Sequence, residues 1–271
     1  VDGVLLVDSG VADPAAKDID SLIDTPTNYT AASGNNGGNY CTFNPIDRNA
    51  SGNYQEAPTN GNLDTNPRGD FTGTIPVTSG KWYWEITITT VTTAGQAYIG
   101  VLDVEQIRTG GSRGWATSQI AAMRDTGGLY GDGSTGSGVS YTQGDVLGFA
   151  LDATSGKLWI AKNNTWINSG NPAGGTGHAF SGLSYSAYTL IVSDSQTGQV
   201  YSLNAGQKPF ANTPPTDFLS ICTTNLPDPT IADGSTAFDT KLYNGNGSSQ
   251  TISGMNFGPD LIWSKIRSST G

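Results

Sequence analysis

The chain has 271 residues, of which 37 are glycine and only 13% are charged, so turn and strand residues are abundant and helix-forming residues are scarce. This composition predicts an all-β protein with one large domain and room for smaller segments. A net charge of -10 with no basic run argues against a nucleic-acid partner, and no apolar stretch approaches the roughly 20 residues of a membrane-spanning helix.

Residues 1–24 are predicted to be a connector that contains one short helix. Asp13 supplies an N-cap, Pro14 suits the first helical position, and apolar residues follow at helical spacing, namely Ile19, Leu22 and Ile23. Asparagine, glycine and proline are then frequent up to residue 72. This predicts irregular surface, interrupted by a strand at 40–43 and a weak strand near 62–65.

The strongest strand pattern is at residues 80–88, Gly-Lys-Trp-Tyr-Trp-Glu-Ile-Thr-Ile. Alternate residues of a strand point to opposite faces, so one face carries Trp82, Trp84, Ile86 and Ile88. The other face carries Lys81, Tyr83, Glu85 and Thr87 and is expected to be polar. Burial of each large apolar side chain contributes roughly 2 to 3 kcal/mol before entropy is subtracted, so the sheet is expected to form around this strand.

Seven further segments are predicted to be strands of the same domain: 97–102, 146–151, 158–160, 166–167, 188–193, 200–204 and 218–223. Residues 103–143 have a weaker pattern, with loops expected at 110–115 and 131–136. From residue 234 onward, three short strands are predicted at 241–243, 250–252 and 261–266. They have no partner to cover their apolar side, so this segment is expected to begin another module or to be completed by a neighbouring chain.

The two cysteines, Cys41 and Cys222, are too few for a structural metal site. They could form a disulfide if their strands are neighbours. The alternative is two buried thiols, and this alternative is favoured.

Five motifs occur in an order that resembles the SPRY domain. They are Gly80-Lys81-Trp82-Tyr83-Trp84-Glu85, Tyr98-Ile99-Gly100-Val101, Gly144-Asp145-Val146-Leu147-Gly148, Leu151-Asp152 with Gly156-Lys157-Leu158, and Asn204-Ala205-Gly206-Gln207-Lys208-Pro209-Phe210. The resemblance covers about residues 25–231 and implies a two-sheet antiparallel β-sandwich, related to the concanavalin-like jelly rolls and used for recognition without catalysis. The expected domains are a connector at 1–24, the sandwich at 25–232 and a small β segment at 233–271.

Two stretches also resemble bacteriophage proteins. Residues 219–227 are similar to the end of SPRY-like modules of phage virion and fibre proteins, and residues 242–263 resemble a module that follows such domains. These resemblances imply a virion or extracellular location. They also imply sister subunits in a homotrimer, other virion proteins and a host surface glycan or protein as partners. The long insert before the central strand and the region at 103–143 depart from the family, so the loop contacts of better-known members have no equivalent positions here.

Residues suited to hydrolytic chemistry are few. The only glutamates are Glu56, Glu85 and Glu105. A retaining glycosidase needs two carboxyl groups about 5 to 5.5 Å apart, and no glutamate pair has the strand spacing that would provide them. Asp145 and Asp152 flank a strand and are interpreted as turn residues. His178, the only histidine, lies in a glycine-rich loop and is interpreted as a solvated side chain, so the chain is not expected to be an enzyme.

Candidate binding residues lie in loops. Asp132 offers one carboxylate where a tight calcium site needs several oxygens, so a turn is favoured and no metal or cofactor is predicted within the chain. A metal at a trimer axis or between modules is the alternative. Aromatic side chains in or beside loops could stack on sugar rings or anchor a peptide. The candidate ligand-binding residues are Trp115, Tyr130, Asp132, Trp166 and Tyr185, with the two tryptophans favoured, whereas Tyr141 is expected in the core.

Three functions of different classes fit these observations. The favoured hypothesis is a non-enzymatic structural and recognition module of a phage virion, a tail fibre or capsid-attached appendage, that displays loops from a rigid sandwich. The alternative is a carbohydrate-binding or adhesin module of a bacterial surface protein. A glycoside hydrolase is disfavoured by the glutamate count.

Overall fold

The computed structural model describes residues 39–47, 57–65, 68–92, 97–108, 119–227, 231 and 233–267. The helix predicted within the connector lies outside these residues, as do Glu56 and Trp115. The chain divides into two compact units, Val1–Leu226 and Pro227–Gly271, and only the first contains strands among the described residues.

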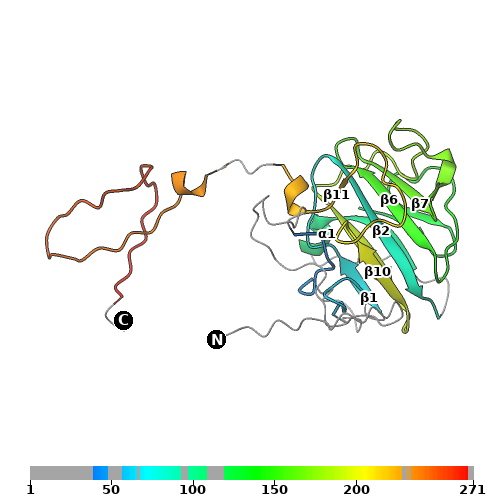
Figure 1. The fold of residues 1–271 in the computed structure, drawn as a ribbon, viewed down its shortest axis with the longest axis horizontal. Helices are drawn as coiled ribbons and strands as arrows, with labels where there is room; N and C mark the ends of the chain where they lie inside the picture. The colour runs from blue at the N-terminus through cyan, green and yellow to red at the C-terminus, as the bar shows by residue number, and fades with distance from the viewer. Residues whose placement is uncertain are drawn as a thin grey trace. The chain divides into compact units, whose positions relative to one another are not determined.

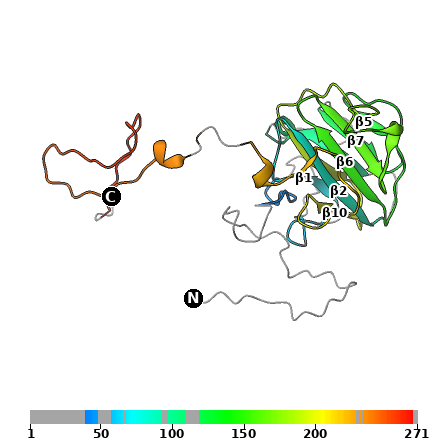
Figure 2. The ribbon, with the colours of Figure 1, turned by 45° about the horizontal axis from the view of Figure 1, so that its top comes forward.

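Two sheets form the first unit. The five-stranded sheet has the order β1 (Gly69–Thr72), β9 (Tyr188–Asp194), β3 (Ala97–Asp103), β4 (Ile120–Arg124) and β5 (Leu129–Gly131). The six-stranded sheet has the order β10 (Val200–Asn204), β2 (Lys81–Thr90), β6 (Val146–Asp152), β7 (Lys157–Lys162) and β8 (Thr165–Trp166). Its sixth strand, β11 (Leu219–Ser220), pairs in parallel with β2, whereas every other strand pair is antiparallel. Figures 1 and 2 show β10, β2, β6 and β7 side by side.

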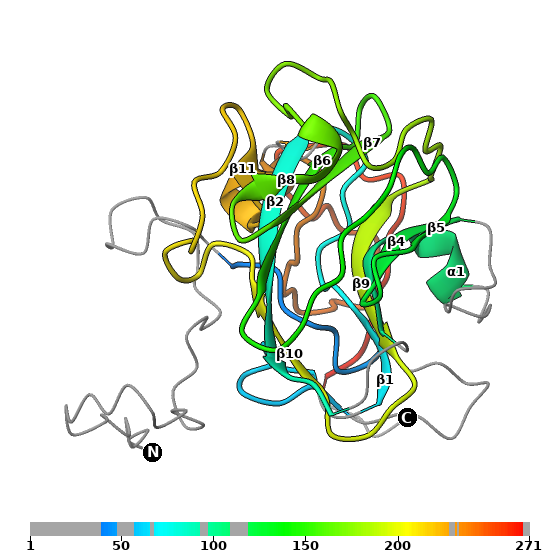
Figure 3. The ribbon, with the colours of Figure 1, turned by 90° about the vertical axis from the view of Figure 1, so that its right-hand side faces the viewer.

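The two sheets lie face to face, as the side view in Figure 3 shows, and side chains of both form the main core. A short helix, α1 (Val104–Arg108), follows β3, and three 3₁₀ turns lie at Ile167–Ser169, Thr223–Asn225 and Gly234–Thr236. The predicted two-sheet antiparallel sandwich is therefore confirmed. Among the residues that the structure describes, no helix has the length and hydropathy needed to cross a bilayer.

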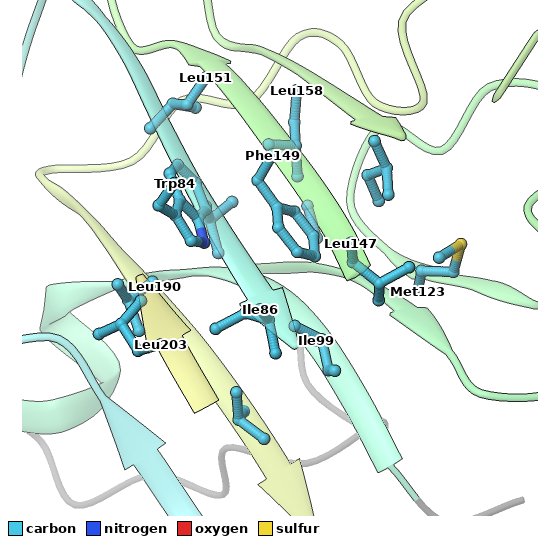
Figure 4. Close-up of a cluster of buried hydrophobic side chains, with 14 of the residues drawn as sticks. Trp84, Ile86, Ile99, Met123, Leu147, Phe149, Leu151, Leu158, Leu190 and Leu203 are labelled. Atoms are coloured by element: carbon cyan, nitrogen blue, oxygen red, sulfur yellow. The ribbon is translucent and has the colours of Figure 1, made fainter. Parts of the chain in front are cut away.

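The inner face of β2 is as predicted. Trp82, Trp84, Ile86 and Ile88 are all buried in the main core. The Trp84 ring stacks on Phe149 of β6, with ring centroids 5.3 Å apart and an angle of 7° between the planes. Figure 4 shows Trp84, Ile86 and Phe149 facing Ile99, Met123 and Leu190 of the opposite sheet. The strand with the clearest apolar alternation therefore lies at the centre of the sandwich.

The outer face of β2 is not the polar surface that the sequence predicted. Tyr83 and Glu85 are each only 1% exposed, because residues 205–218 cover this face. Tyr83 packs edge-on against Phe210, with ring centroids 4.9 Å apart. Together with Ala150, Trp159, Phe218 and the half-buried Trp166 and Phe210, Tyr83 forms a second apolar group, which we call the outer cluster.

Glu85 holds this covering segment through a group of hydrogen bonds. Its Oε2 accepts from the backbone N–H of Ala211 at 2.8 Å. Its Oε1 accepts from the backbone N–H of Asn212 at 2.8 Å, from Asn212 Nδ2 at 3.0 Å and from the Tyr83 hydroxyl at 2.9 Å. A buried carboxylate is stable when it is surrounded by donors in this way. Burial, and then the charge of Glu85, raise the pKa of Tyr83 well above its ordinary value, so the phenol stays protonated as a donor.

Several predicted strands differ in extent. Residues 40–43 form single bridges, Tyr40 with Cys222 and Phe43 with Gly73, and Asp64 bridges to Thr59 and Ser202. The strand predicted at 218–223 is reduced to β11. The region at 103–143 contains α1, β4 and β5, which its weak pattern did not indicate. The β4 sequence, Ile-Ala-Ala-Met-Arg, is buried over four residues and therefore shows no alternation of polar and apolar side chains.

Cys41 and Cys222 lie on neighbouring segments, yet they are both buried thiols and form no disulfide. Tyr40 pairs with Cys222, and the backbone N–H of Cys41 donates to the carbonyl of Ile221 at 2.9 Å. This register is displaced by one residue, so the two cysteine side chains point to opposite faces. Cys41 packs in the main core, where Ile221 also lies.

The second unit has no strand among its described residues 233–267. The three strands predicted at 241–243, 250–252 and 261–266 are therefore wrong for the single chain. Figure 1 shows this stretch as an irregular trace with one short turn, in which the Asp233 side chain accepts from the backbone N–H of Ser235. Its large side chains that are exposed are Phe238, Leu242, Tyr243, Leu261, Ile262, Trp263 and Ile266.

Candidate functional site

Three loops at residues 131–138, 166–170 and 178–186 are joined to one another, and we call them the loop platform. Ser134 forms a bridge with Phe180, and the backbone N–H of Thr135 donates to the carbonyl of Ala179 at 2.7 Å. The backbone N–H of Ser181 donates to the carbonyl of Gly133 at 2.8 Å. Gly133 has φ +63°, and a Cβ there would lie 1.9 Å from the carbonyl oxygen of Ser181, so this close approach requires glycine.

Side chains add further bonds between the loops. Asn168 Nδ2 donates to the carbonyl of Thr135 at 2.9 Å, while Asn168 Oδ1 accepts from the backbone N–H of Ser137 at 3.1 Å. The Thr135 hydroxyl donates to the carbonyl of His178 at 2.6 Å. The platform therefore presents exposed side chains, including Ser134, Ser137 and Asn168, from a backbone held in one arrangement. Such preorganisation reduces the entropy lost when a partner binds.

A polar group at one side of the platform ties it to the five-stranded sheet. Asp132 Oδ2 accepts from the backbone N–H of Gln119 at 2.7 Å. Asp103, at the end of β3, is 2% exposed and accepts from the backbone N–H of Ser186 at 3.1 Å and from its hydroxyl at 2.6 Å. Burial and then the charge of Asp132 raise the pKa of Tyr185 well above its ordinary value. The Asp132 carboxylate therefore lies close enough to the Tyr185 phenol for its negative charge to oppose ionisation of the phenol.

The structure brings together two of the five candidate residues. Asp132 and Tyr185 interact at one side of the loop platform. Trp166, the last residue of β8, is half-buried against the outer cluster. Tyr130 lies on β5 and packs edge-on against Tyr98, with ring centroids 5.3 Å apart, on a different apolar group. Trp115 lies outside the described residues. Tyr141 is buried in the main core, as predicted.

His178 is not the solvated side chain that its glycine-rich loop suggested. It is half-buried, its ring lies edge-on to Trp159 at 6.0 Å, and its Nδ1 is 3.2 Å from the Thr135 hydroxyl. It therefore helps to hold the platform. Sequence reasoning also missed Asp103, Asn168 and Ser186. The Asn163-Asn164 and Asn168 positions with positive φ give the one local signal, because asparagine favours that conformation in turns.

The acidic side chains of the described residues do not form a metal-binding cluster. Within the described ranges, no three or more His, Cys, Asp or Glu side chains gather where they could hold a metal ion. Asp145, interpreted as a turn residue, accepts from the backbone N–H of Thr142 at 2.8 Å and pairs with Lys162 at 2.9 Å. Asp152 accepts from the backbone N–H groups of Thr154 and Ser155 in the turn after β6. Both carboxylates have structural roles.

Asp194 is a buried carboxyl outside the platform and makes stability depend on pH. It is 5% exposed, and burial and, to a smaller extent, the charge of Asp125 raise its pKa to about 6. Tyr141 and Tyr201 face the same region. Because the folded state holds this proton more tightly than the unfolded chain, the contribution to stability is fully present below the ordinary pKa near 4 and is lost as the pH rises through about 6.

We therefore expect Asp194→Asn to raise the free energy of unfolding at pH 8 by about 1 to 2 kcal/mol and to flatten its decline between about pH 4 and 7. Urea unfolding at several pH values measures this. Asp260→Asn, at an exposed carboxyl, is the control and should leave the profile unchanged. If the pH profile of Asp194→Asn matched that of the wild type, Asp194 would not be the source of the pH dependence of stability.

Comparisons with known proteins find similarity to two families and to a solved structure. Residues 81–208 match the SPRY domain family, and residues 233–271 match a domain of unknown function, DUF7483. A solved structure, the SPRY domain of human HERC1, is 19% identical, covers 59% of this chain and 96% of its own, and superposes with a TM-score of 0.44. No curated protein matches the chain. Residues 81–208 of this chain are thus similar to the SPRY domain family.

Proposed function

We propose that this chain is a non-enzymatic structural and recognition module of a phage virion, a tail fibre or capsid-attached appendage, in which the loop platform contacts the partner. SPRY domains are protein-interaction modules, so a binding role is the starting point. The observation that carries the proposal is the set of hydrogen bonds among the loops at 131–138, 166–170 and 178–186. Loops held by a rigid sandwich are well suited to recognition.

The virion setting is supported by the resemblance of residues 219–227 and 242–263 to phage proteins. On this proposal the protein is located on the virion, outside the cell. Its partners are sister subunits in a homotrimer, other virion proteins, and a protein or glycan on the host surface. The acidic chain does not act on nucleic acid in this role.

The geometry of the candidate acids supports recognition over catalysis. Glu85 is buried and its oxygens accept four hydrogen bonds, three of them from the segment that covers it. His178 packs against Trp159 and holds Thr135. Both residues therefore have structural roles in the fold, which leaves binding as the function that the described side chains support best.

The test is binding of fluorescently labelled chain to a panel of bacterial strains, compared between surface variants. Ser137→Arg and Ser184→Arg place a large charged side chain on exposed platform positions and should reduce binding at least about tenfold. Gln143→Arg, exposed in the turn before β6 and outside the platform, is the matched control and should bind like the wild type. Equal loss in all three variants, or no effect of the platform variants on measurable binding, would contradict the assignment of the platform.

A carbohydrate-binding or adhesin module is the second candidate. Its support is Trp166, the last residue of β8, which is half-buried and packs against the outer cluster. Aromatic rings in such positions stack on sugar faces. A glycan array would separate the candidates, because specific signals lost in Trp166→Ala, with the folded state checked by thermal unfolding, indicate a lectin.

A further inference from the structure

Residues 233–267 carry an unusual concentration of exposed apolar side chains. Leu261, Ile262 and Trp263 are 87%, 77% and 91% exposed, and they follow one another in sequence. Exposed apolar patches of this kind mark interaction sites in soluble proteins. The segment matches its own family, over residues 233–271, so it is a unit distinct from the sandwich.

The backbone of this unit also lacks the pairing that its sequence predicts. The described hydrogen bonds within it are local, such as those of the turn at Gly234–Thr236 and of Asn246 with Ser248. The segments 241–243, 250–252 and 261–266, predicted from the sequence to be strands, do not pair in the single chain. Backbone groups of this kind pair readily with an added strand from another chain.

The sandwich offers little that could cover these side chains. Among the described residues of the first unit, only Ile46 and Leu219 are large, apolar and exposed. An equal set of apolar side chains is found in the same segment of a second copy. A surface that pairs with itself gives a closed symmetric assembly.

The distribution of charge also favours a second copy of this segment as its partner. Residues 233–271 contain three acidic side chains, Asp233, Asp239 and Asp260, and three basic ones, Lys241, Lys265 and Arg267, so their net charge is zero. The whole net charge of -10 therefore lies on residues 1–232, which repel their counterparts in other copies. Copies of the neutral segment meet without this repulsion, and opposite charges are available to set their register.

From these observations we infer that residues 233–267 form the assembly core of the protein, in which strands of this segment pair with the same segment of other copies. The inference rests on the part of the proposed function that names sister subunits as partners. The sandwiches then extend from a common centre, each with its own loop platform available. The three strands that the single chain does not form are completed between copies.

The test is sedimentation equilibrium of the whole chain and of two matched variants. The wild type should be an oligomer, with a mass at least twice the 28.1 kDa of one chain. Ile262→Asp should weaken association at least about 100-fold, because it places a charge in the apolar contact. Ile46→Asp, at an isoleucine that is 86% exposed on the other unit, should not change it. Amide exchange at 241–243, 250–252 and 261–266 should slow as the oligomer forms.

Two results would overturn the inference: a wild-type chain that stays at 28.1 kDa up to about 100 µM, or an oligomer that Ile262→Asp leaves intact. Thermal unfolding of the sandwich in Ile262→Asp should equal that of the wild type, which excludes misfolding as the cause of dissociation. Strain binding by the platform is measured on the same proteins. A monomeric chain whose binding is still lost in Ser137→Arg would refute the assembly core alone, whereas an oligomer without platform-dependent binding would refute the recognition role alone.

Discussion

Replacing Trp84 by alanine is expected to lower the free energy of unfolding by about 3 to 5 kcal/mol, the largest effect of any single truncation proposed for this chain. Trp84 is 1% exposed and stacks on Phe149 between the two sheets. Truncation to alanine removes this contact and leaves a cavity that the surrounding strands fill only in part. Urea unfolding followed by circular dichroism measures the change.

Trp84→Phe is the matched variant for this position. Phenylalanine keeps an aromatic ring against Phe149, and no described residue accepts a hydrogen bond from Trp84 Nε1, so the loss of the indole N–H leaves no acceptor there without its donor. We expect a decrease of only about 1 to 2 kcal/mol. If Trp84→Ala lost less than about 1 kcal/mol, the central position of β2 in the core would be contradicted.

Replacing Glu85 by alanine is expected to lower the free energy of unfolding by about 3 kcal/mol, because buried donors lose their acceptor. These donors are the Tyr83 hydroxyl, the backbone N–H groups of Ala211 and Asn212, and Asn212 Nδ2. The segment at 205–218 should then open, since Glu85 connects it to β2. Hydrogen exchange at the amides of Ala211 and Asn212 should accelerate, and limited proteolysis should cut within this segment first.

Two further variants define the role of Glu85. Glu85→Gln keeps one oxygen for Asn212 and Tyr83 but turns an amide toward the Ala211 N–H, so it should lose about 1 to 3 kcal/mol. Asp217→Asn makes the same carboxylate-to-amide change at an exposed position of the same segment and should stay within about 0.5 kcal/mol of the wild type. A loss in Asp217→Asn equal to that in Glu85→Gln would show that the hydrogen bonds of Glu85 are not the cause.

Part of the candidate site was predictable from composition. The sequence predicts that Asp132, Trp166 and Tyr185 lie in or beside loops, and in the structure Asp132 and Tyr185 lie in loops of the platform while Trp166 ends β8. Tyr130, also predicted in or beside a loop, lies on β5 against Tyr98. Composition indicates loops but does not say which loops meet. That depends on the order of the strands in the two sheets, which brings residues 131–138 beside residues 178–186.

The sequence by itself determined that the chain is all-β, that β2 lies in its core, and that Trp84 and Ile86 face inward, because alternation along a strand is a local property. The two-sheet arrangement was implied by the resemblance to the SPRY domain and not by this alternation. Only the tertiary structure decided what covers the other face. Glu85 looked like a surface residue until a segment 126 and 127 residues later supplied its donors. In the same way, a register displaced by one residue separated Cys41 from Cys222. Periodicity specifies which side chains share a face, whereas the partner of that face is chosen by contacts between residues far apart in the chain.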